Sequence, residues 1–200
     1  IANRVGKNFK NFKMIKLRTM IVDAEKSKVF STKSGDSRIT WIGNILRKYK
    51  LDEIPQLFNI LKLEMSFVGP RPNVKFEIDQ YNEFEKKLLS IIPGITDFAS
   101  IVFSDEADIL KDSLDPNEDY KKFIRPWKSL LGLIYIKEKN LFVDIYLMYL
   151  TLVSIFNRKY ALKKIYLILE KKYDSELLEI ILRNKDIKNF KFDEKYFEKF

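Results

Sequence analysis

The sequence predicts a predominantly helical α+β fold with a small β element. Residues 39–48 and 54–61 carry apolar side chains at helical spacing, and residues 141–156 form an apolar run broken by a single charge. By contrast, residues 9–19 mix phenylalanine and aliphatic side chains with lysines, which favours a short strand or hairpin arm with its turn near residues 10–11. The 200 residues are enough for one domain with a substantial core, with room for an appendage.

Prolines and glycines set the boundaries of the other expected elements. Pro55 is tolerated only in the first turn of a helix, so a helix is expected to begin near Asp52. Residues 65–72 contain two prolines and a glycine, which predict a rigid turn. The other expectations are an N-cap at Thr40, a helix and then a loop over residues 20–34, an amphipathic helix over 76–89, a turn at 93–96, a strand over 98–103, alternating basic and apolar residues over 158–183, and a poorly patterned tail at 184–200.

The complete absence of histidine and cysteine excludes several kinds of functional site. A serine triad with an imidazole base, a thiol nucleophile, a zinc finger, a histidine-ligated metalloprotease site and a disulfide framework cannot be built in their usual form. Carboxylates, lysine, arginine, hydroxyl groups and oxygen-ligated metals such as magnesium remain available for chemistry.

The positive charge is concentrated at the start of the chain. The formal net charge is +9, and residues 1–50 contain 13 basic and 3 acidic residues, whereas residues 51–200 contain 24 and 25. A concentrated positive field indicates an anionic partner, which would be a nucleic acid, a phosphorylated small molecule or an anionic lipid surface. A solvated basic surface without a partner is the plainer interpretation of the same composition.

Asp52 and Glu53 are the first candidates for chemistry. At a helix N-terminus the backbone N–H groups and the helix dipole favour an anion, so the pKa of Asp52 is expected to be low. An ionised carboxylate suits a nucleophile or a metal ligand. Adjacent helical residues point about 100° apart, so one carboxylate can face a reacting atom while the other faces a cation. A helix-capping role for Asp52 is the structural alternative.

Four cationic residues accompany this acidic pair in the sequence: Lys16, Arg18, Arg47 and Arg71. Arg71 stands between Pro70 and Pro72, and an arginine on such a stiff turn suits bidentate recognition of phosphate. An arginine that merely pairs with a neighbouring helix is the alternative.

The apolar run at residues 141–156 is too short for a membrane span. Sixteen helical residues extend about 24 Å, whereas the hydrocarbon core of a bilayer is about 30 Å thick. Because the run is apolar on every side, it predicts either a buried helix or one lying in a membrane interface.

Together these motifs resemble the bacterial sugar transferases, the monotopic phosphoglycosyl transferases that begin lipid-linked glycan assembly. The resemblance covers residues 3–155, and its most specific blocks are Leu-Asp-Glu-Ile-Pro-Gln at 51–56 and Gly-Pro-Arg-Pro at 69–72. The other matching blocks are residues 3–7, 12–20, 39–47, 57–62, 65–68, 93–96 and 140–151.

The resemblance implies a reaction and a role for each candidate residue. Members of the family transfer a sugar phosphate from a UDP-sugar to a polyprenyl (undecaprenyl) phosphate, with magnesium and a covalent intermediate, and release UMP. Asp52 would be the nucleophile and Glu53 would help to hold Mg²⁺ against the diphosphate. The residues matching family positions near the phosphates are Lys16, Arg18, Arg47 and Arg71, and Asp144 matches an acid near the site.

The resemblance also implies an architecture and a location. Residues 1–157 would form the catalytic domain and residues 158–200 a C-terminal helical extension and tail. Family members normally carry a hydrophobic membrane hairpin before the block at residues 3–7, and this chain starts at Ile1 without it. The basic segment and the run at 141–156 would then lie on the anionic cytoplasmic face of the bacterial inner membrane, as interfacial helices. A homo-oligomer is left open.

Three positions depart from the family pattern: Ile92, where an arginine is common; Asp97, where a glycine is common; and Gly132, where an acid is common. These departures put the identity of the sugar in question. Two other functions therefore stand beside the transferase: a nucleic-acid-binding module, suggested by the basic segment with its interleaved phenylalanines, and an inactive scaffold of a glycan assembly complex.

Overall fold

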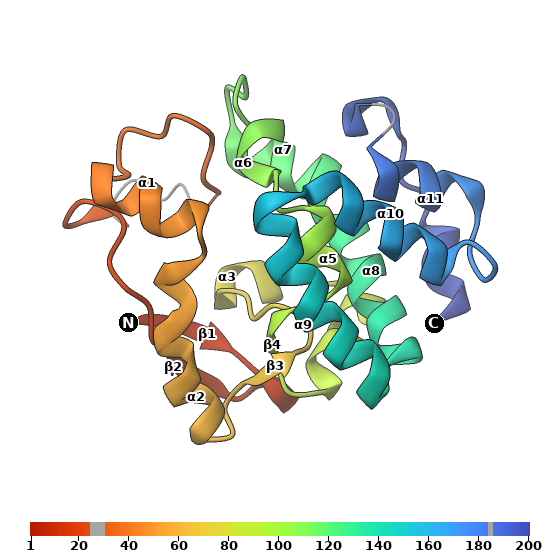
Figure 1. Cartoon of the computed structure of the whole chain (residues 1–200), viewed down its shortest axis with the longest axis horizontal. Helices are drawn as coiled ribbons and strands as arrows, with labels where there is room; N and C mark the ends of the chain where they lie inside the picture. Colours follow the sequence, from red (N-terminus) through yellow and green to blue (C-terminus); the bar gives the residue numbers. More distant parts are fainter. Residues whose placement is uncertain (25–30, 184–185) are drawn as a thin grey trace.

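The protein is described by a computed structural model that covers residues 1–24, 31–183 and 186–200. Its described part is predominantly helical and contains two small two-stranded sheets, which confirms the predicted α+β class. Figure 1 shows the first third of the chain on one side of the molecule and the long helices on the other, with the two sheets near their junction.

The N-terminal hairpin confirms the predicted β element but shifts its turn. Strands β1 (Ala2–Val5) and β2 (Asn11–Met14) pair antiparallel, with Ala2 opposite Met14. Residues 6–10, including η1 (Lys7–Phe9), form the turn, so the prediction of a turn near residues 10–11 was wrong. Asn8 adopts a left-handed backbone conformation with φ of 52°, and asparagine tolerates that conformation better than most residues.

The segment after the hairpin carries two short helical elements and a 3-10 turn. Helix α1 (Trp41–Lys48) begins as predicted, because the Thr40 hydroxyl accepts a hydrogen bond of 3.0 Å from the Gly43 N–H. The 3-10 helix η3 (Leu51–Gln56) runs into α2 (Leu57–Leu61), which confirms a helical start near Asp52. Residues 25–30 of the predicted helix and loop over residues 20–34 lie outside the described residues, and no α-helix is assigned to the described remainder.

Two expected turns contain the strands of the second sheet. Strands β3 (Ser66–Val68) and β4 (Gly94–Thr96) pair in parallel, so the prediction of turns alone at residues 65–72 and 93–96 was wrong. The two chains approach so closely that a Cβ on Gly94 would lie 2.1 Å from the Gly69 nitrogen. A strand of three residues gives too little alternation to outweigh the neighbouring prolines and glycines.

Local capping explains two further differences. The predicted helix over 76–89 is divided into α3 (Lys75–Ile78), α4 (Glu83–Lys86) and η4 (Lys87–Ser90), because Asn82 and Glu85 form a capping box that starts a new helix. The predicted strand over 98–103 is instead the helix α5 (Phe98–Val102). Its N-cap is Asp97, whose carboxylate accepts a 2.7 Å hydrogen bond from the Ser100 N–H.

The main core lies between α5 and the long helices. The remaining elements are α6 (Glu106–Ile109), α7 (Pro116–Asp119), the π-helix η5 (Tyr120–Ile124), α8 (Arg125–Glu138), α9 (Leu141–Phe156), α10 (Arg158–Leu169), α11 (Ser175–Leu182), η6 (Ile187–Asn189) and η7 (Glu194–Lys199). Phe98, Ile101, Leu131 and Ile134 are all fully buried in this core. The last elements belong to the same core, since Phe197 is buried and the rings of Trp127 and Phe192 are 4.9 Å apart.

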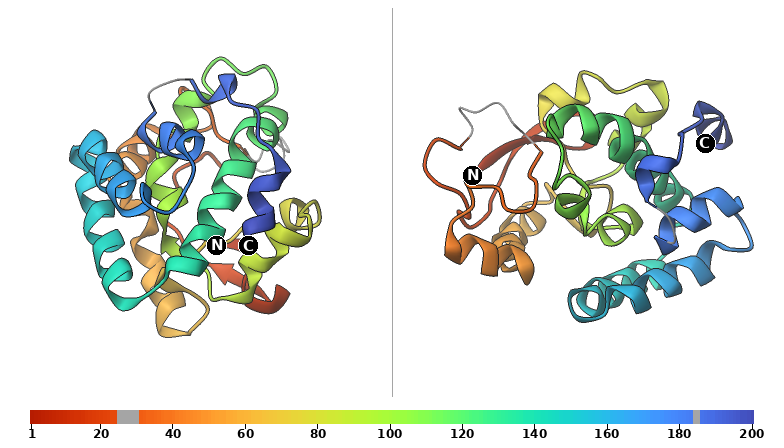
Figure 2. Two further views of the ribbon diagram at one scale, coloured as in Figure 1. Left: turned by 90° about the vertical axis from the view of Figure 1, so that its right-hand side faces the viewer. Right: turned by 90° about the horizontal axis from the view of Figure 1, so that it is seen from above.

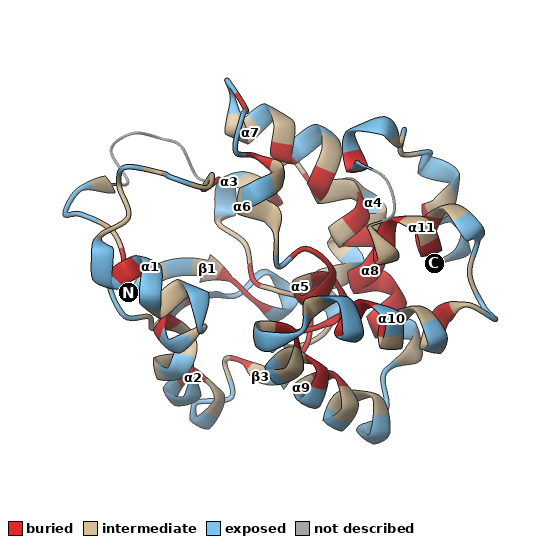
Figure 3. Ribbon diagram, turned by 45° about the horizontal axis from the view of Figure 1, so that its top comes forward, coloured by how far each residue is buried: buried red, intermediate tan, exposed pale blue. Residues whose placement is uncertain are grey.

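Helix α9 buries one side and exposes the other. Leu147 and Leu150 are fully buried, while Phe142 is 84% exposed. The run at 141–156 therefore agrees in part with both interpretations, because one side of the helix is buried in the core and the other is exposed at the surface. Figure 3 shows the same division between buried and exposed residues along this helix.

No helix within the described residues is both long enough and apolar enough to cross a bilayer.

Candidate active site

Hydrogen bonds of the Asn59 side chain join helix α2 to strand β2 and the residue that follows it. The buried Asn59 side chain accepts a hydrogen bond of 2.9 Å from the Ile15 N–H and donates one of 2.9 Å to the Lys13 carbonyl. Two residues further on, the Leu17 N–H donates a 3.0 Å hydrogen bond to the Asp52 carbonyl. Lys16 is thereby held between two anchored residues and faces the turn that carries the acidic pair.

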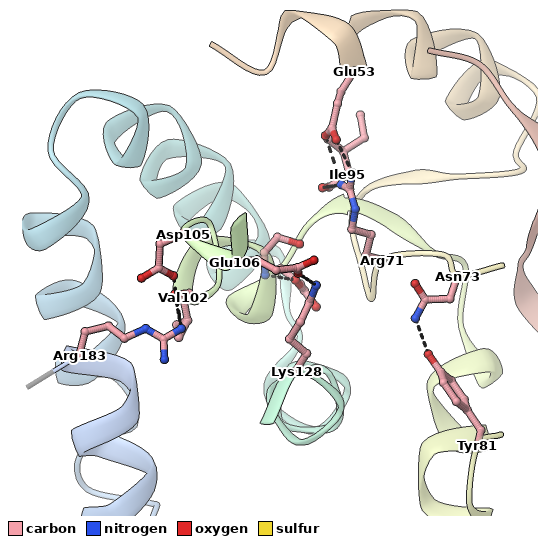
Figure 4. A network of polar contacts seen from close by, with 12 residues as sticks. Glu53, Arg71, Asn73, Tyr81, Ile95, Val102, Asp105, Glu106, Lys128 and Arg183 are labelled. Atoms are coloured by element: carbon pink, nitrogen blue, oxygen red, sulfur yellow. Dashed lines mark hydrogen bonds and ion pairs between the residues drawn. The ribbon is translucent and has the colours of Figure 1, made fainter. Parts of the chain in front are cut away.

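The Glu53 carboxylate lies at the centre of an ion-pair cluster. The Arg71 guanidinium donates to both of its oxygens, and the Lys16 ammonium lies 3.4 Å from Oε1. Arg71 is oriented further by a 3.5 Å hydrogen bond from Nη1 to the Ile95 carbonyl. Figure 4 shows the Arg71 side chain extending toward Glu53 and Ile95. The structure therefore brings together three of the predicted site residues.

The charges of this cluster shift the pKa values of its members. Burial by itself would raise the pKa of Glu53, but Arg71 and Lys16 outweigh burial and lower it to about 2. Burial, together with the neighbouring Arg71, lowers the pKa of Lys16 to about 8. Glu53 is consequently ionised throughout the neutral range.

Asp52 differs from its neighbour in having no partner. The residue is 7% exposed, and no hydrogen bond or ion pair joins its carboxylate to any residue that the structure describes. Burial raises the pKa of Asp52, which Lys16 only partly opposes, so the expectation of a low pKa at a helix N-terminus was wrong. Asp52 also lies inside η3, a 3-10 helix of six residues whose N-cap is Lys50, so its side chain does not cap the helix.

The other predicted residues lie at different distances from this pair. Arg47 donates a 2.9 Å hydrogen bond to the Thr19 hydroxyl and interacts electrostatically with Asp52. Arg18 is exposed, and no ion pair connects it to the acidic pair within the described residues. The Asp144 carboxylate accepts a 2.8 Å hydrogen bond from the Tyr135 hydroxyl and takes no part in the Glu53 cluster.

Lys50 belongs to the site although the sequence did not single it out. It precedes η3 in a left-handed backbone conformation with φ of 55°. Its ammonium interacts electrostatically with Glu53 and with Arg71, and burial lowers its pKa. A lysine directly before the Leu-Asp-Glu block is visible in the sequence, but only the backbone conformation reveals that it turns into the site.

The donor set was tested for the magnesium ion that the resemblance implies. No cluster of three or more acidic side chains that might enclose a metal ion occurs within the described residues. Magnesium is commonly held by one or two carboxylates together with substrate phosphates and water. Asp52 has free oxygens, whereas the Glu53 oxygens already accept hydrogen bonds from Arg71 and Lys16. The pair therefore fits magnesium only when phosphate oxygens supply most of the coordination.

Two of the positions that depart from the family pattern line one cavity. Asp97 and Gly132 both border a cavity that also includes Arg71. A Cβ on Gly132 would lie 3.9 Å from Oδ2 of Asp97. The third position, Ile92, is half-buried, and its carbonyl oxygen packs close to Gly69.

Comparison with known proteins places the chain in a family. The model of the bacterial sugar transferases matches residues 1–158. The chain therefore belongs to the bacterial sugar transferase family, as its motifs predicted.

Three relatives from different bacteria show similar levels of identity. The UDP-N-acetylgalactosamine-undecaprenyl-phosphate N-acetylgalactosaminephosphotransferase of Aeromonas hydrophila is 31% identical over 158 residues, which cover 78% of this chain and 34% of the relative. The undecaprenyl-phosphate galactose phosphotransferase of Salmonella typhimurium is 32% identical, covering 74% of this chain and 31% of the relative. The UDP-glucose:undecaprenyl-phosphate glucose-1-phosphate transferase of Klebsiella pneumoniae is 32% identical, covering 79% and 32% respectively. The chain thus spans about a third of the length of these relatives.

Proposed function

We propose that this protein transfers a sugar-1-phosphate from a UDP-sugar to a membrane polyprenyl (undecaprenyl) phosphate and so begins the assembly of a glycan. Residues 1–157 act as the catalytic domain, and residues 158–200 are an extension packed on it. The names of the relatives support this class of reaction, and they specify three different sugars. The relatives therefore do not identify the sugar, and the residues of this chain's own site must select it.

The observation that carries the proposal is the contrast between Asp52 and Glu53. Glu53 is fully engaged by Arg71 and Lys16, whereas the adjacent Asp52 carboxylate is unpaired and lies within electrostatic range of the same cations. A carboxylate is a competent nucleophile without a general base, so a chain that lacks histidine can supply one. Cations beside it offset the repulsion between an anionic nucleophile and an anionic diphosphate.

The proposed reaction has two displacement steps. An Asp52 oxygen attacks the sugar-linked phosphorus of the donor, and the bond between that phosphorus and the bridging oxygen breaks with its electron pair leaving on UMP. A phosphate oxygen of the polyprenyl phosphate then attacks the same phosphorus, and breakage of the aspartyl–phosphorus bond restores the carboxylate. Lys16 and Arg71 bind the phosphate oxygens in both steps, and neither step requires a proton on Asp52.

A magnesium ion in this site would be held by Glu53, by Asp52 before it reacts, and by the donor phosphates. When bound, it would neutralise charge on the phosphate oxygens.

The reaction is tested directly by supplying both substrates. Wild-type protein, with any upstream segment of its gene included, is incubated with UDP-glucose, UDP-galactose and their N-acetylated counterparts in vesicles that contain undecaprenyl phosphate and magnesium. We expect UMP release and a lipid-linked sugar diphosphate with at least one donor. The absence of both products with every donor would favour the inactive scaffold, and salt-sensitive binding of arbitrary oligonucleotides instead would favour a nucleic-acid-binding module.

Part of the surface also supports binding at the cytoplasmic face of the inner membrane. Exposed apolar side chains on α1, η3 and α2 include Trp41, Ile42, Ile45, Leu51, Ile54, Leu57, Phe58 and Leu61, and those on α9 include Leu141, Phe142, Ile145, Leu152 and Phe156. Figure 2 shows α1, α2 and α9 along the same side of the molecule in its right-hand view. So many exposed apolar side chains on helices of one side are typical of an interaction site, and the net charge of +9 suits an anionic leaflet.

Replacement of one apolar residue on this surface is expected to weaken membrane binding. Phe142→Ser and Phe58→Ser should each reduce the partition coefficient onto vesicles containing anionic lipid by roughly ten- to hundredfold, since an inserted phenylalanine contributes roughly 1.5–3 kcal/mol. Co-sedimentation with vesicles measures the effect. The matched control is Leu114→Ser, because Leu114 is fully exposed between α6 and α7, away from these helices. Equal losses for all three variants would contradict a specific membrane face.

A further inference from the structure

A small cavity lies beside Arg71, and its volume is about 30 Å³. Its polar lining includes Arg71, Asp97, Ser100, Tyr120, Arg125 and Lys128. Figure 4 shows Lys128 and its partner Glu106 next to Arg71. Arg71 therefore belongs both to this cavity and to the Glu53 cluster.

The charges around this cavity are already balanced. The Lys128 ammonium donates a 2.7 Å hydrogen bond to Glu106, and the Arg125 guanidinium lies 3.4 Å from a Glu85 oxygen and 3.8 Å from a Glu77 oxygen. Because each cation faces a carboxylate, the cavity has no excess positive charge for an anion. Its walls suit a neutral group that forms hydrogen bonds.

One buried side-chain oxygen among these residues has no partner within the described structure. It is the Ser100 hydroxyl, whereas Nε and Nη1 of Arg125, which also lack a hydrogen bond, face the Glu85 and Glu77 carboxylates. Buried polar groups in folded proteins nearly always have a hydrogen-bond partner, and a buried group without a hydrogen bond destabilises the fold. The Ser100 N–H is satisfied by Asp97, so only the side-chain oxygen of this residue lacks a partner. The Ser100 oxygen is therefore available to a group that enters the cavity from outside the protein.

We propose that this cavity receives a hydroxyl-sized substituent of the donor's sugar ring, with the Ser100 hydroxyl as its hydrogen-bonding partner. The inference rests on the proposed function, because it starts from a donor whose phosphates lie at Arg71. The sugar is attached directly to the phosphorus that reacts, so its ring lies within a few bonds of that arginine. A volume of about 30 Å³ is ample for one water-sized group. This contact makes Ser100 a specificity-determining residue.

Ser100→Ala provides the test with the smallest structural disturbance. The substitution removes an oxygen that bonds to nothing in the protein and keeps the N–H bond to Asp97, so the melting temperature should not fall. The best donor from the UDP-sugar panel is compared with its monodeoxy analogues. We expect the wild type to prefer the parent donor over one analogue by about three- to tenfold in kcat/KM, the effect of one hydrogen bond. Ser100→Ala should abolish that preference.

Gly132→Ala narrows the same cavity from another side. Its new Cβ would lie 2.8 Å from Cδ2 of Leu88, the mobile end of a side chain that also lines the cavity. Leu88 must move, and we expect the variant to favour the analogue without the recognised hydroxyl over the parent donor. A loss of kcat/KM shared equally by all donors would indicate a purely structural role and overturn the proposal.

Binding measurements separate this inference from the proposed reaction. Calorimetry compares UDP-sugar, its deoxy analogue and UDP with the wild type and Ser100→Ala. If the preference between the sugars responds to Ser100→Ala but UMP is never released, the cavity assignment stands and the proposed reaction fails. If UMP is released and the preference is the same in both proteins, the cavity holds an internal water only and the assignment fails. Absence of any UDP-sugar binding overturns both.

Discussion

Asp52→Asn is expected to abolish both UMP release and the covalent phosphosugar adduct. The asparagine amide keeps the size of the side chain but lacks the negative charge and the nucleophilic oxygen. Loss of a nucleophile in an enzyme that forms a covalent intermediate lowers kcat by at least about 10⁴-fold. Mass spectrometry of protein quenched with donor in the absence of polyprenyl phosphate measures the adduct, and a coupled assay measures UMP.

The same substitution should not destabilise the fold. The Asp52 carboxylate makes no hydrogen bond within the described structure, and burial raises its pKa, which means that the folded state disfavours its charged form. A neutral amide removes that desolvation cost, so the melting temperature of the variant should equal or exceed that of the wild type.

Asp79→Asn is the matched control, because Asp79 is exposed and pairs with Lys75 on the surface. This variant should keep the wild-type rate. Normal UMP release by Asp52→Asn would show that Asp52 is not the nucleophile. A large fall in the melting temperature of this variant would show that unfolding, and not the loss of the nucleophile, explains its lost activity.

Strong local signals allowed part of the fold to be predicted. The spacing of Ile42 and Ile45 together with a capping hydroxyl at Thr40 was sufficient to locate α1. Strand β3 was missed because its three residues stand beside Gly69 and Pro70, whose turn signal dominates, while each residue pairs with one 28 positions further along, as Ser66 does with Gly94. Tertiary pairing of this kind leaves little trace in a short sequence window.

The sequence predicted which residues belong to the candidate site better than it predicted their pKa values. The sequence motifs named Glu53, Arg71 and Lys16, and the structure joins all three in one cluster. The pKa of Asp52 could not be predicted from its position alone, because the desolvation that raises it depends on what packs around η3. The turning of Lys50 into the site likewise depends on a left-handed backbone.

Helical spacing predicted the apolar stripe on α2 but not its environment. Phe58 and Leu61 lie on the expected face, and both are exposed. Periodicity shows that apolar side chains share one face of a helix, and it does not distinguish a protein core from a surface that meets another phase.

Glu53→Gln is expected to damage both stability and activity, because Glu53 compensates the charges of two neighbours. The neutral amide would leave Arg71 and Lys16 without their carboxylate in a mostly buried site. Breaking a buried ion pair from one side costs about 3–5 kcal/mol. Because a third of the Arg71 side chain is exposed, solvent screening should reduce the loss to roughly 2 kcal/mol. Chemical denaturation measures this change, and kcat should fall by two orders of magnitude or more, on the order of the loss of one key electrostatic contact.

The pH dependence identifies the source of that loss. The pKa of Glu53 is lowered from an ordinary 4.5 to about 2 in the folded protein. Its stabilising contribution is therefore complete above the unfolded pKa and disappears as the pH falls from 4.5 toward 2. The difference in unfolding free energy between wild type and Glu53→Gln should shrink over that interval.

The difference should also be small in an Arg71→Met background, because Glu53 stabilises the fold through its ion pair with Arg71. The control Glu83→Gln, in a surface pair with Lys86, should show a far smaller loss at pH 7. A stability difference that is unchanged between pH 5 and pH 2 would show that Glu53 supports the fold by packing and not by its charge.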